Sequence, residues 1–120
     1  MEPSGVAPSP RSGHALAALA GRLVVFGGVS RGARAPVMMN DVHVLDLGAL
    51  HGCLTSHRSD THCLGTMSWE TVAVDGQVPS PRMGAACAAA NDVVFIHGGV
   101  LSDKTLSSEL WILRFRDSSA

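Results

Sequence analysis

The segment from His51 to Cys63 carries the densest group of side chains that could do chemistry. Thiolate and imidazole are the ligands that zinc prefers, so Cys53, His57, His62 and Cys63 form a candidate metal site. Their spacing matches no common zinc finger, and the adjacency of His62 and Cys63 hinders chelation of one ion by both. The competing interpretation is a loop insertion, because extra surface residues cost a folded domain little. Both interpretations stay open at this stage.

A second chemical candidate is the glycine-rich stretch at Gly27, Gly28 and Gly32, which follows a strand-like apolar run. A phosphate-binding loop of this kind needs a helix directly after the glycines, so that the amides at the helix N-terminus meet the phosphate. Here the glycines lead to Ala33-Arg34-Ala35-Pro36, and a second copy of the pair at Gly98-Gly99 lacks the third glycine. Nucleotide binding is therefore a minor alternative.

Composition narrows the class of function. The net charge is -1 and only 16% of the residues are charged, whereas nucleic acid and anionic membrane both need a concentrated basic face. We expect neither as a partner. Three cysteines without a framework spacing suggest a reducing compartment, and the N-terminus lacks the features of a signal peptide. We expect a soluble, cytoplasmic protein without a cofactor.

The elements that would position these groups come from an internal repeat. Gly5–Gly13 (GVAPSPRSG) returns as Gly76–Gly84 (GQVPSPRMG), 71 positions later. At the same shift, an apolar run that ends in Gly-Gly returns, at Leu23–Gly28 and Val94–Gly99. A repeat of this length indicates a modular architecture. Since repeat scaffolds usually present a surface, the pattern favours an interaction module.

Short apolar and β-branched runs between turn residues predict strands. The predicted strands are His14–Leu19, Arg22–Gly27, Asp41–Leu47 and Trp69–Val74, then Ala85–Ala89, Val93–His97 and Leu110–Phe115. The Gly-Gly pair is expected to end its strand and allow a reversal, which makes Ser30–Asn40 a predicted loop. The run HALAALAG, residues 14–21, could instead form a helix, although isolated helices of about two turns are marginal.

This ordered set of residues resembles the kelch repeat, one blade of a kelch β-propeller. The first copy matches at Pro10, Arg11, Gly13, His14, Gly27, Gly28, Asn40, Asp41, Asp46 and Trp69, and the second at Pro81, Arg82, Gly84, Gly98, Gly99 and Glu109. The resemblance covers roughly residues 5–47, 67–99 and 106–115. Kelch-type enzymes that resemble galactose oxidase depend on tyrosine, and this chain contains none. We therefore expect no enzyme of that kind.

Each matched position has an expected physical role. The arginine of each Pro-Arg pair should bind carbonyls or acidic groups between blades, such as Asp41 or Glu109. Trp69 should pack between sheets. The small residues Ala15, Ala17 and Ala18, with Ala86, Ala88 and Ala89, suit an innermost strand, because blades crowd together at the central axis.

The predicted fold class is all-β: a partial kelch-type β-propeller of about two four-stranded antiparallel blades, the second incomplete. Residues 1–4 form an N-terminal tail, 5–75 the first repeat with a loop insertion at 48–66, 76–116 a truncated second repeat, and 117–120 a C-terminal tail. Closed propellers use about four to eight blades, so the chain looks cut from a larger array. Exposed blade faces and open strand edges would favour self-association.

The expected function is that of a non-catalytic protein–protein interaction module, possible types being a scaffold or a substrate adaptor. Loops vary and bind on repeat scaffolds, so the candidate contact surface is Val29–Asn40, Gly48–Thr66 and Val100–Ser107. The alternative is a metal-binding module, or the remnant of a kelch-type enzyme, that uses the insertion 51–63. The identity of the protein partner is not encoded in these patterns.

Overall fold

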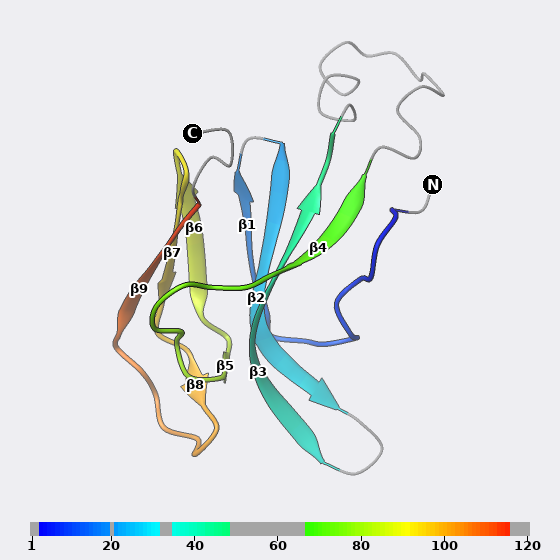
Figure 1. Ribbon diagram of the computed structural model, residues 1–120. Coiled ribbons are helices and arrows are strands. Elements are labelled where there is room, and N and C mark those ends of the chain that lie inside the picture. Colours follow the sequence, from blue (N-terminus) through cyan, green and yellow to red (C-terminus); the bar gives the residue numbers. More distant parts are fainter. Residues whose placement is uncertain (1–2, 20, 32–34, 49–66, 116–120) are drawn as a thin grey trace.

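The computed structural model describes residues 3–19, 21–31, 35–48 and 67–115, and these residues form β-strands without any helix (Figure 1). The first sheet is antiparallel with the order β1-β2-β3-β4, made of β1 (Ala15–Leu19), β2 (Arg22–Arg31), β3 (Pro36–Asp46) and β4 (Ser68–Val72). The second sheet has the order β6-β7-β9, made of β6 (Ala86–Ala90), β7 (Val93–His97) and β9 (Leu110–Arg114). A two-stranded sheet pairs β5 (Arg82–Met83) with β8 (Val100–Leu101). The predicted all-β fold of adjoining blades is confirmed.

All seven predicted strands are present, and the helical alternative for residues 14–21 is wrong. That run forms β1, whose Ala15 and Ala17 are buried against the second sheet. Alanine has a high helix propensity, but here tertiary packing decides the conformation. The two-residue strands β5 and β8 were not predicted, because two residues are too few to show a period.

The prediction that Gly27-Gly28 ends its strand is wrong. β2 continues to Arg31, and β3 begins at Pro36, so most of the predicted loop Ser30–Asn40 lies in strands. The two glycines have φ values of 66° and 102° and lie at a β-bulge, where the register shifts between Phe26 and Gly28. Positive φ at glycine is what such a bulge uses to bend a strand without ending it. Because described residues on both sides of Gly32 are strands, the phosphate-loop alternative is wrong as well.

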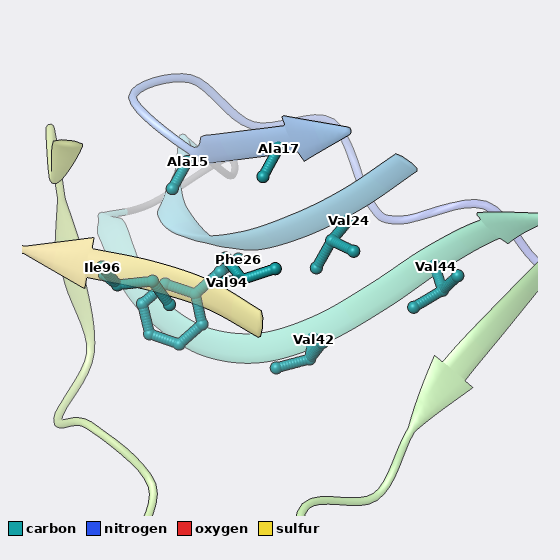
Figure 2. Packing of buried hydrophobic residues seen from close by; sticks show 8 residues of the cluster. All are labelled: Ala15, Ala17, Val24, Phe26, Val42, Val44, Val94 and Ile96. Carbon is teal, nitrogen blue, oxygen red and sulfur yellow. The ribbon is translucent and has the colours of Figure 1, made fainter. Parts of the chain in front are cut away.

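The core lies between the two large sheets. One face of the first sheet packs against one face of the second, with β1 and β6 side by side (Figure 1), and Figure 2 shows the side chains that are buried between the sheets. Small side chains on these first strands allow the sheets to approach closely. The buried members of the cluster are Ala15, Ala17, Val24, Phe26, Val42, Val44, Val94 and Ile96.

The second sheet also has an outer face that the described residues leave largely uncovered. Ala86 and Ala88 lie on this face, and both are exposed, although their counterparts 71 positions earlier, Ala15 and Ala17, are buried. On β9, Leu110 and Ile112 are 59% and 54% exposed. This outer face therefore has the composition of a buried blade face. No helix among the described residues is long and apolar enough to cross a membrane.

We predict that the 120-residue chain self-associates, because apolar faces of this kind favour contact over exposure to water. Replacing Leu110 and Ile112 together with Thr should shift sedimentation velocity profiles toward the monomer at equal protein concentration. The matched control is Val37→Thr, since Val37 is 57% exposed but lies on β3. A wild-type chain that stays monomeric at all concentrations and unfolds in a steep urea transition would contradict the prediction.

Candidate functional site

An arginine from the Pro-Arg connector binds the third strand of the first repeat. Nη1 and Nη2 of Arg11 donate to Oδ1 and Oδ2 of Asp41 at 2.6 and 3.1 Å. Nη1 also donates to the carbonyl oxygen of Gly27 at 3.1 Å, and Nε to the carbonyl oxygen of Ser9. This two-point pairing uses the fork geometry of the guanidinium group. The arginine thus joins the connector, the bulge of β2 and the middle of β3.

The second repeat builds the same cluster around Arg82, which is fully buried. Nη2 of Arg82 donates to Oε1 of Glu109 at 3.0 Å, and Nη1 donates to the carbonyl oxygen of Gly98 at 3.1 Å. Ser107 adds its hydroxyl oxygen at 3.2 Å from Nη1, and Ser80 accepts from Nε. The expected bonds to Asp41 and Glu109 are confirmed. However, each arginine binds its own repeat, so the expectation of bonds between blades is wrong.

A ring nitrogen completes both clusters, and sequence reasoning missed it. Nε2 of His43 lies 2.8 Å from Oδ2 of Asp41, and Nε1 of Trp111 donates to Oε1 of Glu109 at 3.2 Å. His43 and Trp111 occupy equivalent positions in the two sheets. His43 pairs with Val25, Trp111 pairs with Ile96, and Ile96 is the repeat counterpart of Val25, 71 positions later. The sequence could show this equivalence only if the third strand of the first repeat were aligned with that of the second independently of the other strands.

The first cluster also resembles an acid–base relay. Nδ1 of His43 lies 3.3 Å from Oγ1 of Thr71, which gives the order Asp41, His43, Thr71. Two observations favour a structural role. Asp41 is already paired with Arg11, and the equivalent of His43 is a tryptophan, whose indole nitrogen can only donate. We therefore assign Nε2 of His43 as a donor to Asp41, which leaves Nδ1 to accept from the Thr71 hydroxyl.

The clusters set the protonation of their carboxylates. The hydrogen bond from Arg11, assisted by His43, lowers the pKa of Asp41 to about 2, although partial burial opposes the shift. Hydrogen bonds from Arg82 and then Trp111 lower the pKa of Glu109. Both carboxylates are therefore ionised at neutral pH, as pairing with a buried guanidinium requires.

Contacts between the repeats use backbone and amide groups. The backbone nitrogen of Gly84 donates to the carbonyl oxygen of Gly13 at 2.7 Å. Nδ2 of Asn40 donates to the carbonyl oxygen of Pro79 at 3.1 Å. A Cβ at Gly27 would lie 2.8 Å from the carbonyl oxygen of Arg82, so this glycine is required for close approach. These three contacts add to the apolar core that packs the second repeat against the first.

The other matched positions lie outside these clusters. The tryptophan that packs against the core cluster is Trp111, whereas Trp69 is half-buried on β4, opposite Leu45. The carboxylate of Asp46 accepts from the backbone nitrogen of Gly48. His14 is exposed, next to the bulge at Gly28. Gly99 packs closely on the backbone of Met83. The remaining matched positions, Pro10 and Pro81, directly precede Arg11 and Arg82 in the chain.

The candidate metal ligands Cys53, His57, His62 and Cys63 lie outside the described residues. Within the part of the chain that the structure does describe, no three His, Cys, Asp or Glu side chains gather in a way that could hold a metal ion. The metal interpretation therefore has no structural support here.

The candidate segment Val100–Ser107 is described, and so is Val29–Asn40 apart from residues 32–34. The described parts of both lie at the same end of the molecule (the lower end in Figure 1). One is the β2–β3 hairpin, which carries Val37. The other is Val100–Ser107, a tight loop closed by backbone bonds from Leu101 to Thr105 and from Ser107 to Gly99, both 2.9 Å. It exposes Leu106, whose exposed fraction is 82%.

Comparison with known proteins gives a consistent result. The model of the KLHDC2/KLHL20/DRC7 Kelch-repeats domain matches residues 1–119. The chain is 38% identical over 104 residues to the Rab9 effector protein with kelch motifs of Rattus norvegicus, covering 86% of this chain and 23% of that protein. It is 38% identical over 96 residues to Acyl-CoA-binding domain-containing protein 4 of Arabidopsis thaliana, covering 79% of this chain and 11% of that protein. It is 29% identical over 127 residues to human Host cell factor 1, covering 92% of this chain and 6% of that protein. The chain thus spans less than a quarter of the length of these relatives.

The lowered pKa of Asp41 predicts a specific pH dependence of stability. The folded pKa of about 2 lies below the unfolded value of about 3.9. The stabilisation is therefore complete above about pH 4 and is lost as the pH falls toward about 2. Between pH 5 and pH 2.5, the urea midpoint of Asp41→Asn should fall less than that of the wild type. Asp75→Asn is the control for removing one exposed carboxylate, and equal pH dependence in the wild type and Asp41→Asn would contradict the prediction.

Proposed function

The chain belongs to the kelch-repeat family, and from that premise we propose that it is a non-catalytic protein–protein interaction module of the scaffold or substrate-adaptor type. The proposed contact surface is the end of the molecule that carries the β2–β3 hairpin and Val100–Ser107. The segment Gly48–Thr66 is a further candidate, most of which lies outside the described residues. The proteins that the chain resembles include one named as an effector, which supports a function in binding.

The observation that carries the proposal is the exposure of apolar side chains on ordered hairpins. Leu106 is held by the backbone bonds of its loop, and Val37 is held by the pairing of β3 with β2. A backbone that is already fixed loses little conformational entropy when a partner covers its side chains. Apolar residues in such positions are common centres of binding energy. The hairpins therefore offer a partner two preformed apolar contacts.

The arginine clusters support a non-catalytic role for this end of the molecule. Gly98 stands just before the loop Val100–Ser107 and Ser107 is its last residue, and both accept hydrogen bonds from Arg82. The polar groups of the cluster are thus used to hold the base of the loop. Because these polar groups already bond to Arg82, their role is to stabilise the fold. We infer that the loops next to the cluster make the contacts with a partner.

The first purified partner to test is Rab9. Its choice rests on the printed name of the relatives from rat, mouse, cattle and human, which are described as Rab9 effectors. We propose the cytoplasm as the compartment, since the three cysteines show no disulfide framework in their spacing.

The test compares partner capture by the wild type with capture by a Val37→Ser, Leu106→Ser double variant. Quantitative mass spectrometry, followed by binding assays with each purified partner, should show at least about tenfold weaker binding for the double variant. Val6→Ser is the matched control, because Val6 is 79% exposed but lies in the N-terminal segment. A chain without residues 49–66 reports on the third candidate segment. Unchanged binding in both the double variant and the deletion would overturn the proposed surface.

A further inference from the structure

The connector that leads into the second arginine cluster presents an accessible serine. This connector crosses from β4 to β5 (Figure 1), and its residues 73–80 form no strand. Ser80 is exposed and is followed directly by Pro81. The segment is nevertheless held in place, because Nδ2 of Asn40 donates to the carbonyl oxygen of Pro79 at 3.1 Å. A proline also disfavours the helical conformation of the residue before it. The chain thus displays a Ser-Pro pair in a fixed, non-helical segment.

The same pair occurs in the first repeat as Ser9-Pro10, and the sequence holds no other Ser-Pro or Thr-Pro pair. Ser9 is exposed although the second repeat packs against its repeat, and Ser80 is exposed although the first repeat contacts its connector. A neighbouring repeat on either side therefore leaves this position open to solvent.

The hydroxyl of Ser80 already contacts the arginine of the cluster. Its Oγ accepts from Nη2 of Arg82 at 3.2 Å, and that same Nη2 donates to Oε1 of Glu109 at 3.0 Å. A phosphate on Oγ would add a charge of about −1.5 to −2 beside this nitrogen. Pairs of guanidinium and phosphate are among the strong charge-assisted hydrogen bonds. A phosphate on Ser80 and the carboxylate of Glu109 would thus compete for one nitrogen and repel each other.

The two repeats differ in how firmly the carboxylate is held. In the first repeat, Asp41 receives two bonds from Arg11 and lies 2.8 Å from the ring nitrogen of His43. In the second repeat, Glu109 receives one bond from Arg82, and its side chain is 57% exposed. An exposed carboxylate can turn into water at little cost, because exposed ion pairs contribute little. A phosphate is therefore expected to change the second cluster more than the first.

We propose that Ser80 is a phosphorylation site for a proline-directed serine/threonine protein kinase, and that its phosphate takes Arg82 from Glu109 and loosens the loop Val100–Ser107. In the transfer, Oγ of Ser80 forms a bond to the γ-phosphorus of ATP, and the bond from that phosphorus to the bridging oxygen breaks, which releases ADP. The hydroxyl proton passes to the catalytic aspartate of the kinase.

The loop responds because its last residues are bonded through the cluster. Oγ of Ser107 accepts from Nη1 of Arg82 and from the backbone nitrogen of Glu109, and the backbone nitrogen of Ser107 closes the loop onto Gly99. When Glu109 turns away, these bonds lose their common anchor. The proposal concerns the order of the loop, so it holds whether or not the loop contacts a partner.

The modification is tested with a purified, activated mitogen-activated protein kinase and Mg-ATP. The substrate is the full 120-residue chain with Ser9→Ala, in which Ser80 begins the remaining Ser-Pro pair. A peptide of residues 74–84 is the unfolded reference. The folded chain should take up phosphate at Ser80 at a rate within about tenfold of the peptide, since a site that required unfolding would be slowed by its opening equilibrium. The control chain with both Ser9→Ala and Ser80→Ala should take up none.

The structural effect is tested by amide hydrogen exchange on the phosphorylated and the unmodified Ser9→Ala chain. Protection in residues 100–109 should fall by at least about tenfold after phosphorylation, with β1 and β2 unchanged. Ser80→Ala is the matched control, because it removes the hydroxyl acceptor without adding charge, and its loop should exchange as in the wild type. In a Glu109→Gln chain, phosphorylation should add little, because the competing carboxylate is absent.

Five outcomes would overturn the proposal. The first two are a peptide that the kinase does not modify and a folded chain that stays unmodified while the peptide is phosphorylated. The third is unchanged exchange in residues 100–109 of the phosphorylated chain, which would show that the phosphate points into solvent. The fourth is an equal rise throughout the described strands, which would show general unfolding. The fifth is a rise of the same size in Ser80→Ala, which would assign the effect to the lost hydroxyl.

Discussion

The structure depends on one interaction made twice, the pairing of a buried guanidinium group with a carboxylate in, or directly before, the third strand of a repeat. A charge removed from water is tolerated only when its donors are satisfied, and Arg82 finds acceptors on Glu109, Gly98 and the serines beside them. Meeting that requirement brings the connector, the glycine pair and the third strand together. Arg11 imposes the same geometry in the first repeat through Asp41. The clusters therefore set where strands and hairpins meet, whereas the apolar core between the sheets sets how the repeats pack.

Much of this arrangement was predictable, because residues that recur at the same position in both copies of a repeat usually stabilise the fold. The strands, the two arginine pairs and the small residues of β1 all followed from pattern and from the resemblance to the kelch repeat. The course of β2 did not, since Gly27-Gly28 has the composition of a strand stop and becomes a bulge only when β3 pairs beyond it. His43 was also not found, because it stands between the apolar residues Val42 and Val44, a pattern in which the polar residue usually faces solvent. It is 7% exposed, held by Asp41 and Thr71.

The charged clusters stabilise the fold, whereas exposed apolar side chains on the loops form the proposed contact surface. Bonds from Arg82 hold both ends of the loop that presents Leu106, so a charged cluster at the base positions an apolar contact at the tip. The described loops suit a folded partner that covers exposed apolar side chains.

The claim that the arginine cluster positions the loop is tested most directly by amide hydrogen exchange on Arg82→Lys. Lysine keeps the charge but not the planar fork that reaches Gly98, Ser107 and Glu109 together. The account predicts faster exchange across Val100–Glu109, where amides such as Leu101 and Ser107 lose their fixed geometry, with β1 and β2 exchanging as in the wild type. Exchange in Val100–Glu109 that is unchanged, or that rises equally throughout the described strands, would contradict it.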